Sequence, residues 1–362
     1  MRKFTRILSL VLAFLLCIPL GACTAKSRLA KFVDFVVEVE TGKTPVVLHL
    51  TDPQIMQPES NIEEKCYSYI RETVQATKPD LIIVTGDLTY GRFDDENGTV
   101  FSGYVSFMES FQIPWAPVFG NHDNECPKGV DWQCQQLEKA KYCLFEQKDL
   151  TGNGNYSVGV LQGNKLLRAF YMLDSNGCGD YSEASGNGKN GIRISAGLGE
   201  DQYAWYENGM QTLKKSYPDA KISMAYHIQT YDFRKIYDEL YKAENGEAAD
   251  VIGLMNGGLK GPWYSTHKHD DLKALGVDSI FVGHEHCNNA SALCDGIRYQ
   301  YGQKSSTYDR YNALTPSGEI VGGYTHEEGS TPLIGGTAFS LSQEDGSILN
   351  PYIYYCGAPF DV

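Results

Sequence analysis

The chain has 362 residues, of which 42% are hydrophobic and 21% charged, so its composition is that of a globular protein long enough for one large domain or two small ones. Its formal net charge of −14 repels the phosphates of DNA and RNA, and no nucleic-acid polymer is expected as a partner. A small phosphorylated substrate is compatible with this charge, because a bound metal ion reverses the local field.

The first 22 residues have the features of a signal peptide. They begin with the basic residues Arg2 and Lys3, and residues 7–20 are almost wholly apolar but too few to span a membrane comfortably. Residues 20–23 read Leu-Gly-Ala-Cys and resemble a bacterial lipobox, so Cys23 is expected to carry a lipid after cleavage. The alternative is ordinary cleavage, with Cys23 as a bystander and a secreted product.

The expected mature protein is a lipoprotein of the bacterial cell envelope, attached to the membrane outside the cytoplasm. Residues 23–44 are expected to form a tether, and residues 45–362 the domain. Eight cysteines follow Cys23, and an even number in an exported chain predicts disulfides, with buried free thiols as the alternative. Local bridges are expected among Cys126, Cys134 and Cys143 and between Cys287 and Cys294. The remaining three are Cys66, Cys178 and Cys356.

Short apolar segments alternate with segments of helical periodicity in the first third of the domain. Residues 46–50, 81–84 and 115–119 are typical of buried strands, and residues 59–77 and 100–111 repeat their apolar side chains at helical spacing. This order of strand, helix, strand, helix and strand predicts an α/β protein with parallel strands.

The second half is richer in strands. The predicted strands are residues 155–161, 166–173, 222–226 and 279–282, and a helix is predicted over 201–216. Residues 174–200 are expected to form a long loop, and the irregular stretch 243–270 a lid or rim. After residue 289, alternating apolar and polar stretches predict edge strands.

Polar side chains follow five of the predicted strands closely, where each strand ends. Ligands of open α/β sheets bind at the carboxyl ends of strands, and carboxylate, amide oxygen and imidazole are donors that divalent metals favour. These residues are Asp52, Asp87, Asn121, His227, His284 and His286. Their joint occurrence predicts a metal site at one edge of the sheet structure.

Five sequence motifs resemble those of the calcineurin-like metallophosphoesterases, in order and approximate spacing, between about residues 45 and 312. They are Asp52-Pro53-Gln54, Gly86-Asp87, Gly120-Asn121-His122-Asp123, His227 and Gly283-His284-Glu285-His286. Residues 226–228 and 283–289 are most similar to the purple-acid-phosphatase-like branch. The resemblance implies a four-layer α/β/β/α sandwich with the metals at the carboxyl ends of strands.

The resemblance also implies a dinuclear centre of two divalent ions, with manganese, iron and zinc as candidates. Asp87 would bridge the ions, Asp52 and His286 would hold the first, and Asn121, His227 and His284 would hold the second. Two such ions bind a phosphate and activate a water for in-line attack on phosphorus. His122 is expected to protonate the leaving alkoxide or steady the phosphoryl oxygens, with Asp123 orienting His122.

One position departs from the family pattern, because Gln54 stands where the family usually has a histidine ligand of the first metal. Its carbonyl oxygen could act as a harder donor or as a hydrogen-bonding neighbour of the ligands. Tyr90 is the other candidate, since purple acid phosphatases carry Gly-Asp-x-x-Tyr and this chain has that spacing from Gly86 to Tyr90. His267 and His269 are expected at the solvated surface, and His49 inside a strand as a structural residue.

The main functional prediction is therefore a metal-dependent phosphoric ester hydrolase, either a phosphatase or a phosphodiesterase. The alternative is a binding protein on the same scaffold, weakened as a catalyst by Gln54. The substrate, the choice between monoester and diester, and the oligomeric state stay open at this point.

Overall fold

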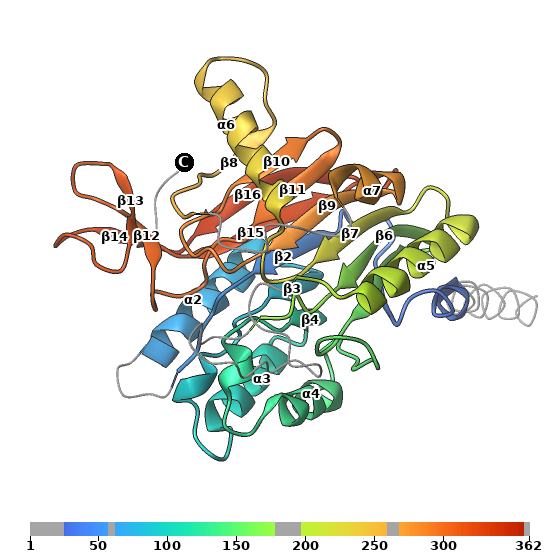
Figure 1. Cartoon of the computed structure of the whole chain (residues 1–362), viewed down its shortest axis with the longest axis horizontal. Helices are drawn as coiled ribbons and strands as arrows, with labels where there is room; N and C mark the ends of the chain where they lie inside the picture. The colour runs from blue at the N-terminus through green and yellow to red at the C-terminus, as the bar shows by residue number, and fades with distance from the viewer. Residues whose placement is uncertain (1–24, 57–61, 178–196, 259–267, 358–362) are drawn as a thin grey trace, which may run out of the picture.

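Two large β-sheets form the centre of the computed structural model, which describes residues 25–56, 62–177, 197–258 and 268–357 (Figure 1). The five-stranded sheet has the order β16 (Ile348–Tyr355), β15 (Gly335–Leu341), β2 (Val46–Leu50), β3 (Leu81–Thr85), β4 (Trp115–Val118). The eight-stranded sheet has the order β1 (Phe35–Val39), β5 (Tyr156–Gln162), β6 (Lys165–Met172), β7 (Lys221–Ala225), β9 (Val277–Val282), β11 (Ile297–Tyr301), β10 (Ser291–Cys294), β8 (Val251–Ile252).

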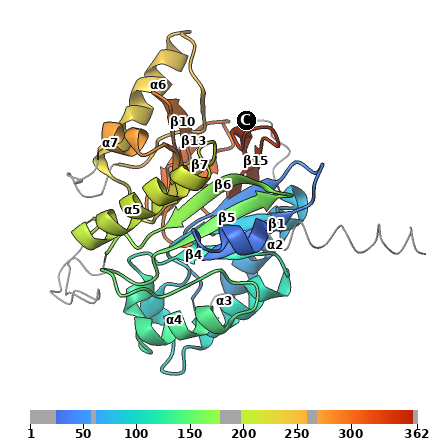
Figure 2. The ribbon, with the colours of Figure 1, turned by 90° about the vertical axis from the view of Figure 1, so that its right-hand side faces the viewer.

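Helices cover the outer face of each sheet, which gives the predicted four-layer α/β/β/α sandwich (Figures 1 and 2). The helices on the five-stranded sheet are α2 (Ile62–Thr77), α3 (Thr99–Ser110) and α4 (Val130–Lys139). Those on the eight-stranded sheet are α5 (Glu200–Ser216), α6 (Lys235–Glu244) and α7 (His269–Ala274). The described residues also form the short 3₁₀ helices η1 (Gly91–Phe93), η2 (Asp123–Glu125) and η3 (Tyr231–Arg234).

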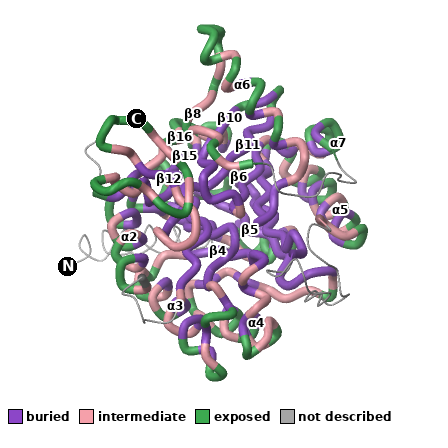
Figure 3. Tube along the Cα trace, turned by 60° about the vertical axis from the view of Figure 1, so that its left-hand side comes forward, coloured by how far each residue is buried: buried purple, intermediate pink, exposed green. Residues whose placement is uncertain are grey.

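The core lies between the sheets and beneath the helices, where central strands such as β3 and β6 are almost wholly buried (Figure 3). Phe281 of β9 stacks on Phe339 of β15 with ring centroids 5.1 Å apart, so the inner faces of the two sheets are in direct contact. His49 of β2 packs edge-on against Phe281 and lies 2.8 Å from the hydroxyl of Thr85, which confirms its structural role. A continuous apolar interior of this kind fixes the register of the strands that carry the site.

The strands that precede the candidate ligands run parallel. β2 pairs with β3 and β3 with β4, all parallel, and β6, β7 and β9 form a second parallel set. The predicted strands over residues 155–161 and 166–173 are present as β5 and β6, which pair antiparallel, and the predicted helices are present as α2, α3 and α5. The α/β class is thus confirmed, and the first residues predicted for α2 lie outside the described part.

The expected tether over residues 23–44 is corrected by the structure. Phe35–Val39 form β1, which pairs in parallel with β5 at one edge of the eight-stranded sheet. Leu29 and Val33 just before it are buried in the core of that sheet. The folded domain therefore begins well before residue 45, because this segment has apolar side chains that the sheet and α5 cover. The predicted signal peptide and Cys23 lie outside the described residues.

Two other expectations are corrected. The C-terminal strands are not all edge strands, since β15 lies between β16 and β2, and β11 lies between β9 and β10. A separate small sheet has the order β13 (Ile320–Gly323), β12 (Tyr311–Leu314), β14 (Thr331–Leu333).

The expected local disulfides are absent among the described cysteines, which are buried free thiols at positions 66, 126, 134, 143, 287, 294 and 356.

The described residues contain no helix with the length and apolar character to cross a membrane. Most of the predicted loop over residues 174–200 lies outside the described part, as do residues 259–267 of the predicted lid and His267 within them. The expected surface position of His269 is corrected, because the residue is only 3% exposed. Its Nδ1 lies 2.8 Å from the hydroxyl of Tyr299. The tyrosine provides the buried imidazole with a polar partner.

Candidate metal centre

The carboxyl ends of five parallel strands meet at one edge of the sandwich and bring the predicted polar residues together. Asp52, Asp87 and Asn121 follow β2, β3 and β4 of the five-stranded sheet. His227 and His284 follow β7 and β9 of the eight-stranded sheet. One sheet thus supplies oxygen donors and the other supplies imidazoles, and the site lies where the two sheets face each other.

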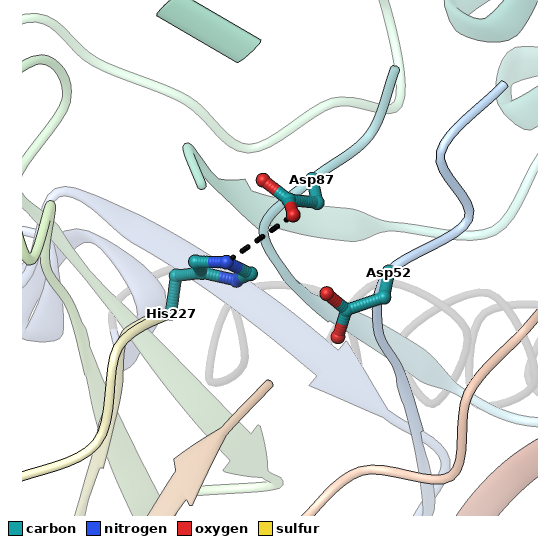
Figure 4. A group of neighbouring side chains, drawn as sticks. All are labelled: Asp52, Asp87 and His227. Atoms are coloured by element: carbon teal, nitrogen blue, oxygen red, sulfur yellow. Dashed lines mark ion pairs between the residues drawn. The ribbon is translucent and has the colours of Figure 1, made fainter. Parts of the chain in front are cut away.

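Asp87 lies close to both Asp52 and His227, and Figure 4 shows the three side chains gathered around one point. Ligand atoms of Asp52, Asp87 and His227 all lie within 4.8 Å of one another, and all three side chains are at most 1% exposed. Buried carboxylates beside an imidazole are arranged as divalent-metal ligands commonly are. The donor set therefore fits a metal ion.

The second metal position of the family corresponds to a compact set of donors around Asn121. Its Oδ1 lies 3.0 Å from Nε2 of His227 and 2.8 Å from Nδ1 of His284, and His227 Nε2 is 3.4 Å from Oδ2 of Asp87. Nδ1–H of His227 donates to the carbonyl of Thr85 at 2.7 Å. This hydrogen bond leaves Nε2 for a metal, the arrangement usual for a histidine ligand.

The first metal position contains Asp52 and His286, with Oδ1 of Asp52 3.2 Å from Nε2 of His286. The other carboxylate oxygen of Asp52 accepts hydrogen bonds from the hydroxyl of Thr51 at 2.7 Å and the backbone N–H of His284 at 3.1 Å. Nδ1 of His286 lies 3.4 Å from Oδ2 of Asp309, a carboxylate behind an imidazole. Such partners orient a ligand and raise its basicity.

Gln54 does not offer its carbonyl oxygen to this position, which corrects the expected ligand role. Its Oε1 accepts a hydrogen bond of 2.8 Å from Nζ of Lys304. Its Nε2 points toward the site, 3.2 Å from Oδ2 of Asp87 and 3.3 Å from Nε2 of His286. An amide NH₂ group donates hydrogen bonds and does not coordinate a cation.

The ligand loops are held in unusual backbone conformations. Asp52, Gln54, Asp87 and His284 have φ angles of 50°, 46°, 50° and 70°, in the left-handed region that non-glycine residues rarely adopt. A Cβ atom at Gly120 would collide with the carboxylate and backbone of Asp87, so only glycine lets these loops approach so closely. Strained residues cluster at functional sites, where the surrounding structure holds them in place.

The electrostatics of the site reflect its closely spaced charges. Burial alone would lower the pKa of His227, but the carboxylates of Asp87 and Asp52 raise it to about 10. Burial and the neighbouring His227 lower the pKa of His284 to about 3. Despite burial, His227 and His122 lower the pKa of Asp87, which keeps this carboxylate ionised. A metal ion would displace the proton of His227 when it binds there.

His122 is oriented by Glu125 and not by Asp123, which corrects a second expectation. Nδ1 of His122 lies 3.1 Å from Oε2 of Glu125, and Arg92 donates to the same carboxylate. The Asp123 carboxylate instead accepts backbone N–H bonds from Thr89 at 3.0 Å and from Gly120 at 2.7 Å. Asp123 thereby joins the loops after β3 and β4, and burial with the Asp87 charge raises its pKa to about 7.

Tyr90 lies against His122 rather than among the ligands. The two rings stack with centroids 3.9 Å apart and an interplanar angle of 22°. Burial of His122 lowers its pKa, but Asp87 and the Glu125 hydrogen bond outweigh this effect and raise it. Tyr90 and Glu125 together fix the imidazole ring at the mouth of the site.

Three residues of the site were not found from sequence. Glu125 lies three residues after His122 and on the same turn, a spacing that could have indicated a partner. Asp309 and Lys304 follow β11 by several residues, and their contacts with His286 and Gln54 span long stretches of chain. No local pattern marks such residues, because the pairing of β11 with β9 and the bridge between Thr51 and Lys304 bring their loop to the site.

The profile of the calcineurin-like phosphoesterases matches residues 45–288, more than half of the chain, and the protein belongs to this family. Phosphatase DCR2 of Saccharomyces cerevisiae is 27% identical over 245 residues, which cover 63% of this chain and 39% of that protein. Probable inactive purple acid phosphatase 29 of Arabidopsis thaliana is 27% identical over 259 residues, covering 65% of this chain and 61% of that protein.

The chain thus spans less than two thirds of the length of these curated relatives. A solved structure of a dimetal phosphatase from Danio rerio aligns with 86% of this chain and 99% of that one, with 10% identity and a TM-score of 0.46. The similarity to purple acid phosphatases agrees with the predicted branch of the family.

Proposed function

We propose that this protein is a metal-dependent phosphoric ester hydrolase that acts on a small phosphorylated substrate. The observation that supports this proposal is the convergence of Asp87, Asn121, His227 and His284 from four strand ends on one point. Packing alone does not explain a group of buried carboxylate, amide and imidazole donors linked by contacts of 2.8, 3.0 and 3.4 Å.

A divalent cation held by these residues would polarise the phosphoryl group and activate a water for attack on phosphorus. His122 would supply the proton for the leaving alkoxide. Its Nδ1 is held by Glu125, so Nε2–H is the group left to donate at the mouth of the site. The raised pKa of His122 favours its protonated form near neutral pH.

The proposed location is outside the cytoplasm, in the bacterial cell envelope, with a lipid on Cys23. The basic and apolar order of residues 1–22 and the small residues before Cys23 support this part of the proposal. Labelling cells with a radioactive fatty acid tests it: the wild-type chain should incorporate label into the membrane fraction, whereas Cys23→Ser should not.

The activity is tested on soluble protein that begins at Thr24. The protein is freed of metal, reloaded with Mn²⁺, and assayed with a chromogenic phosphate monoester and a diester. Metal-dependent turnover of either ester supports the proposal, and the preferred ester identifies a phosphatase or a phosphodiesterase. Tight metal binding without turnover of any phosphate ester would contradict it.

A second candidate is a binding protein with weakened catalysis on the same scaffold. The orientation of Gln54 favours it, because the first metal position lacks one family ligand. The Arabidopsis thaliana relatives are themselves named probable inactive purple acid phosphatases. This candidate predicts metal-dependent binding of inorganic phosphate by calorimetry, with no hydrolysis of either ester.

A further inference from the structure

Lys304 is a buried cation behind the first metal position. It lies three residues after β11, forms an isolated parallel bridge with Thr51, and is 1% exposed. Its Nζ donates to Oε1 of Gln54 at 2.8 Å and to the backbone carbonyl of Asp52 at 3.1 Å. Fully buried lysines are rare, so such a residue is retained only where its charge has a defined role or partner.

The contact with Lys304 fixes the orientation of the Gln54 amide. An ammonium group can only donate hydrogen bonds, so the amide atom that faces it must be the oxygen. The NH₂ group is therefore directed at Oδ2 of Asp87 and Nε2 of His286, at 3.2 and 3.3 Å. These two atoms are the ones that a first metal ion would use, and they face hydrogen-bond donors instead.

The charges around this position agree with a single divalent ion. Asp52, Asp87 and Asp309 are three carboxylates with a formal charge of −3, which one divalent ion and one ammonium group balance. A second divalent ion would lie close to this ammonium at low dielectric, where like charges repel strongly.

We propose that Lys304 and Gln54 together replace the first metal ion, so that the centre binds one tight divalent ion through Asp87, Asn121, His227 and His284. This inference rests on the metal site of the proposed function and specifies its composition. The Lys304 ammonium then supplies the positive charge that the first ion supplies in a dinuclear centre, and the Gln54 NH₂ group holds Asp87 and His286 in position.

The test is a count of Mn²⁺ ions bound by metal-free protein from Thr24 onward, by calorimetric titration and elemental analysis. One tight ion per chain, with the electron paramagnetic resonance spectrum of an isolated Mn²⁺, is expected. Two ions of similar affinity with a spin-coupled spectrum would overturn the inference but leave the proposed hydrolase intact. No bound ion at all would overturn the metal site and therefore the proposed function as well.

A set of variants separates the two residues. Gln54→His alone keeps Lys304 and is expected to bind one tight ion, as is Gln54→His combined with Lys304→Arg, which retains the charge. Gln54→His combined with Lys304→Met is expected to bind a second Mn²⁺ about 10- to 100-fold more tightly than Gln54→His alone. If this double variant binds the second ion no better than Gln54→His alone, Lys304 has no role in excluding it. The wild-type count decides the stoichiometry even if a variant fails to fold.

Discussion

The two sides of Asp87 differ in what they present to a cation. On the side of Asn121, His227 and His284, every side chain offers an oxygen or an imidazole nitrogen, and a backbone carbonyl orients His227. On the side of Asp52 and His286, the Gln54 NH₂ group faces the same space and Lys304 lies behind it. The two metal positions of one scaffold therefore need not bind cations equally. A single residue that presents an NH₂ group in place of a histidine nitrogen makes its position unfavourable for a cation.

The difference also shows what holds a metal site in shape. One histidine on each side has a polar neighbour at Nδ1, since the carbonyl of Thr85 accepts a hydrogen bond from His227 and the Asp309 carboxylate lies 3.4 Å from His286. Positioning is thus similar on the two sides, and the contrast comes from charge and donor type. Substitutions that change charge or donor type one at a time test this contrast.

The largest effect is expected for Asp87→Asn, because this carboxylate faces both sides. Loss of its charge should abolish tight Mn²⁺ binding and lower kcat at least about 10³-fold, since the metal contributes several kcal/mol to the transition state. Equilibrium dialysis and an ester hydrolysis assay measure both effects. The matched control is Asp345→Asn, an exposed carboxylate between β15 and β16, and wild-type activity of Asp87→Asn would exclude the metal model.

His122→Ala should lower kcat by about 10²-fold or more, the usual effect of removing a positioned proton donor. Metal content should be unchanged, because His122 lies outside the ligands on both sides of Asp87. Elemental analysis beside the kinetic assay separates the two roles. His326→Gln, a histidine near the small three-stranded sheet, is the control, and loss of metal in His122→Ala would show that His122 is itself a ligand.

Proton competition should affect the His227 side of Asp87. His227 has a pKa raised to about 10 without metal, so its proton must leave before Nε2 can coordinate. Between about pH 6 and about pH 8 the Mn²⁺ affinity should rise about tenfold per pH unit, or about 10²-fold in all. Calorimetry in buffers of different ionisation enthalpy measures the released proton, and an affinity independent of pH would contradict this assignment.

The smallest effect is expected for Glu125→Gln, which keeps a hydrogen-bond partner for His122 but removes the charge. We expect a loss of about tenfold in kcat. The carboxylate raises the pKa of His122, so its removal lowers that pKa. A general acid is lost as pH rises through its pKa, and the alkaline limb of the pH–kcat profile should therefore move to lower pH. A profile with an unchanged alkaline limb would show that Glu125 does not tune His122.

The sequence predicted the parts of this protein that depend on local pattern. Apolar runs and helical periodicity gave the strands that carry the site and the helices α2, α3 and α5, because each element buries one continuous set of side chains. The motifs after β2, β3, β4, β7 and β9 predicted the residues around Asp87. Parallel strands place their carboxyl ends at one edge, so position along the chain was sufficient to group these residues.

Only the tertiary structure decided the features that depend on distant contacts. The return of β15 beside β2 and the pairing of β1 with β5 join segments far apart in sequence, and a short amphipathic strand does not specify its partner. For the same reason Glu125 replaced Asp123 as the partner of His122, and the cysteines are separate buried thiols. From the sequence, Gln54 could be either a metal ligand through its carbonyl oxygen or a hydrogen-bonding neighbour of the ligands. Its orientation was decided by Lys304, 250 residues away, because an ammonium accepts no hydrogen bond and turns the amide oxygen away from the metal site.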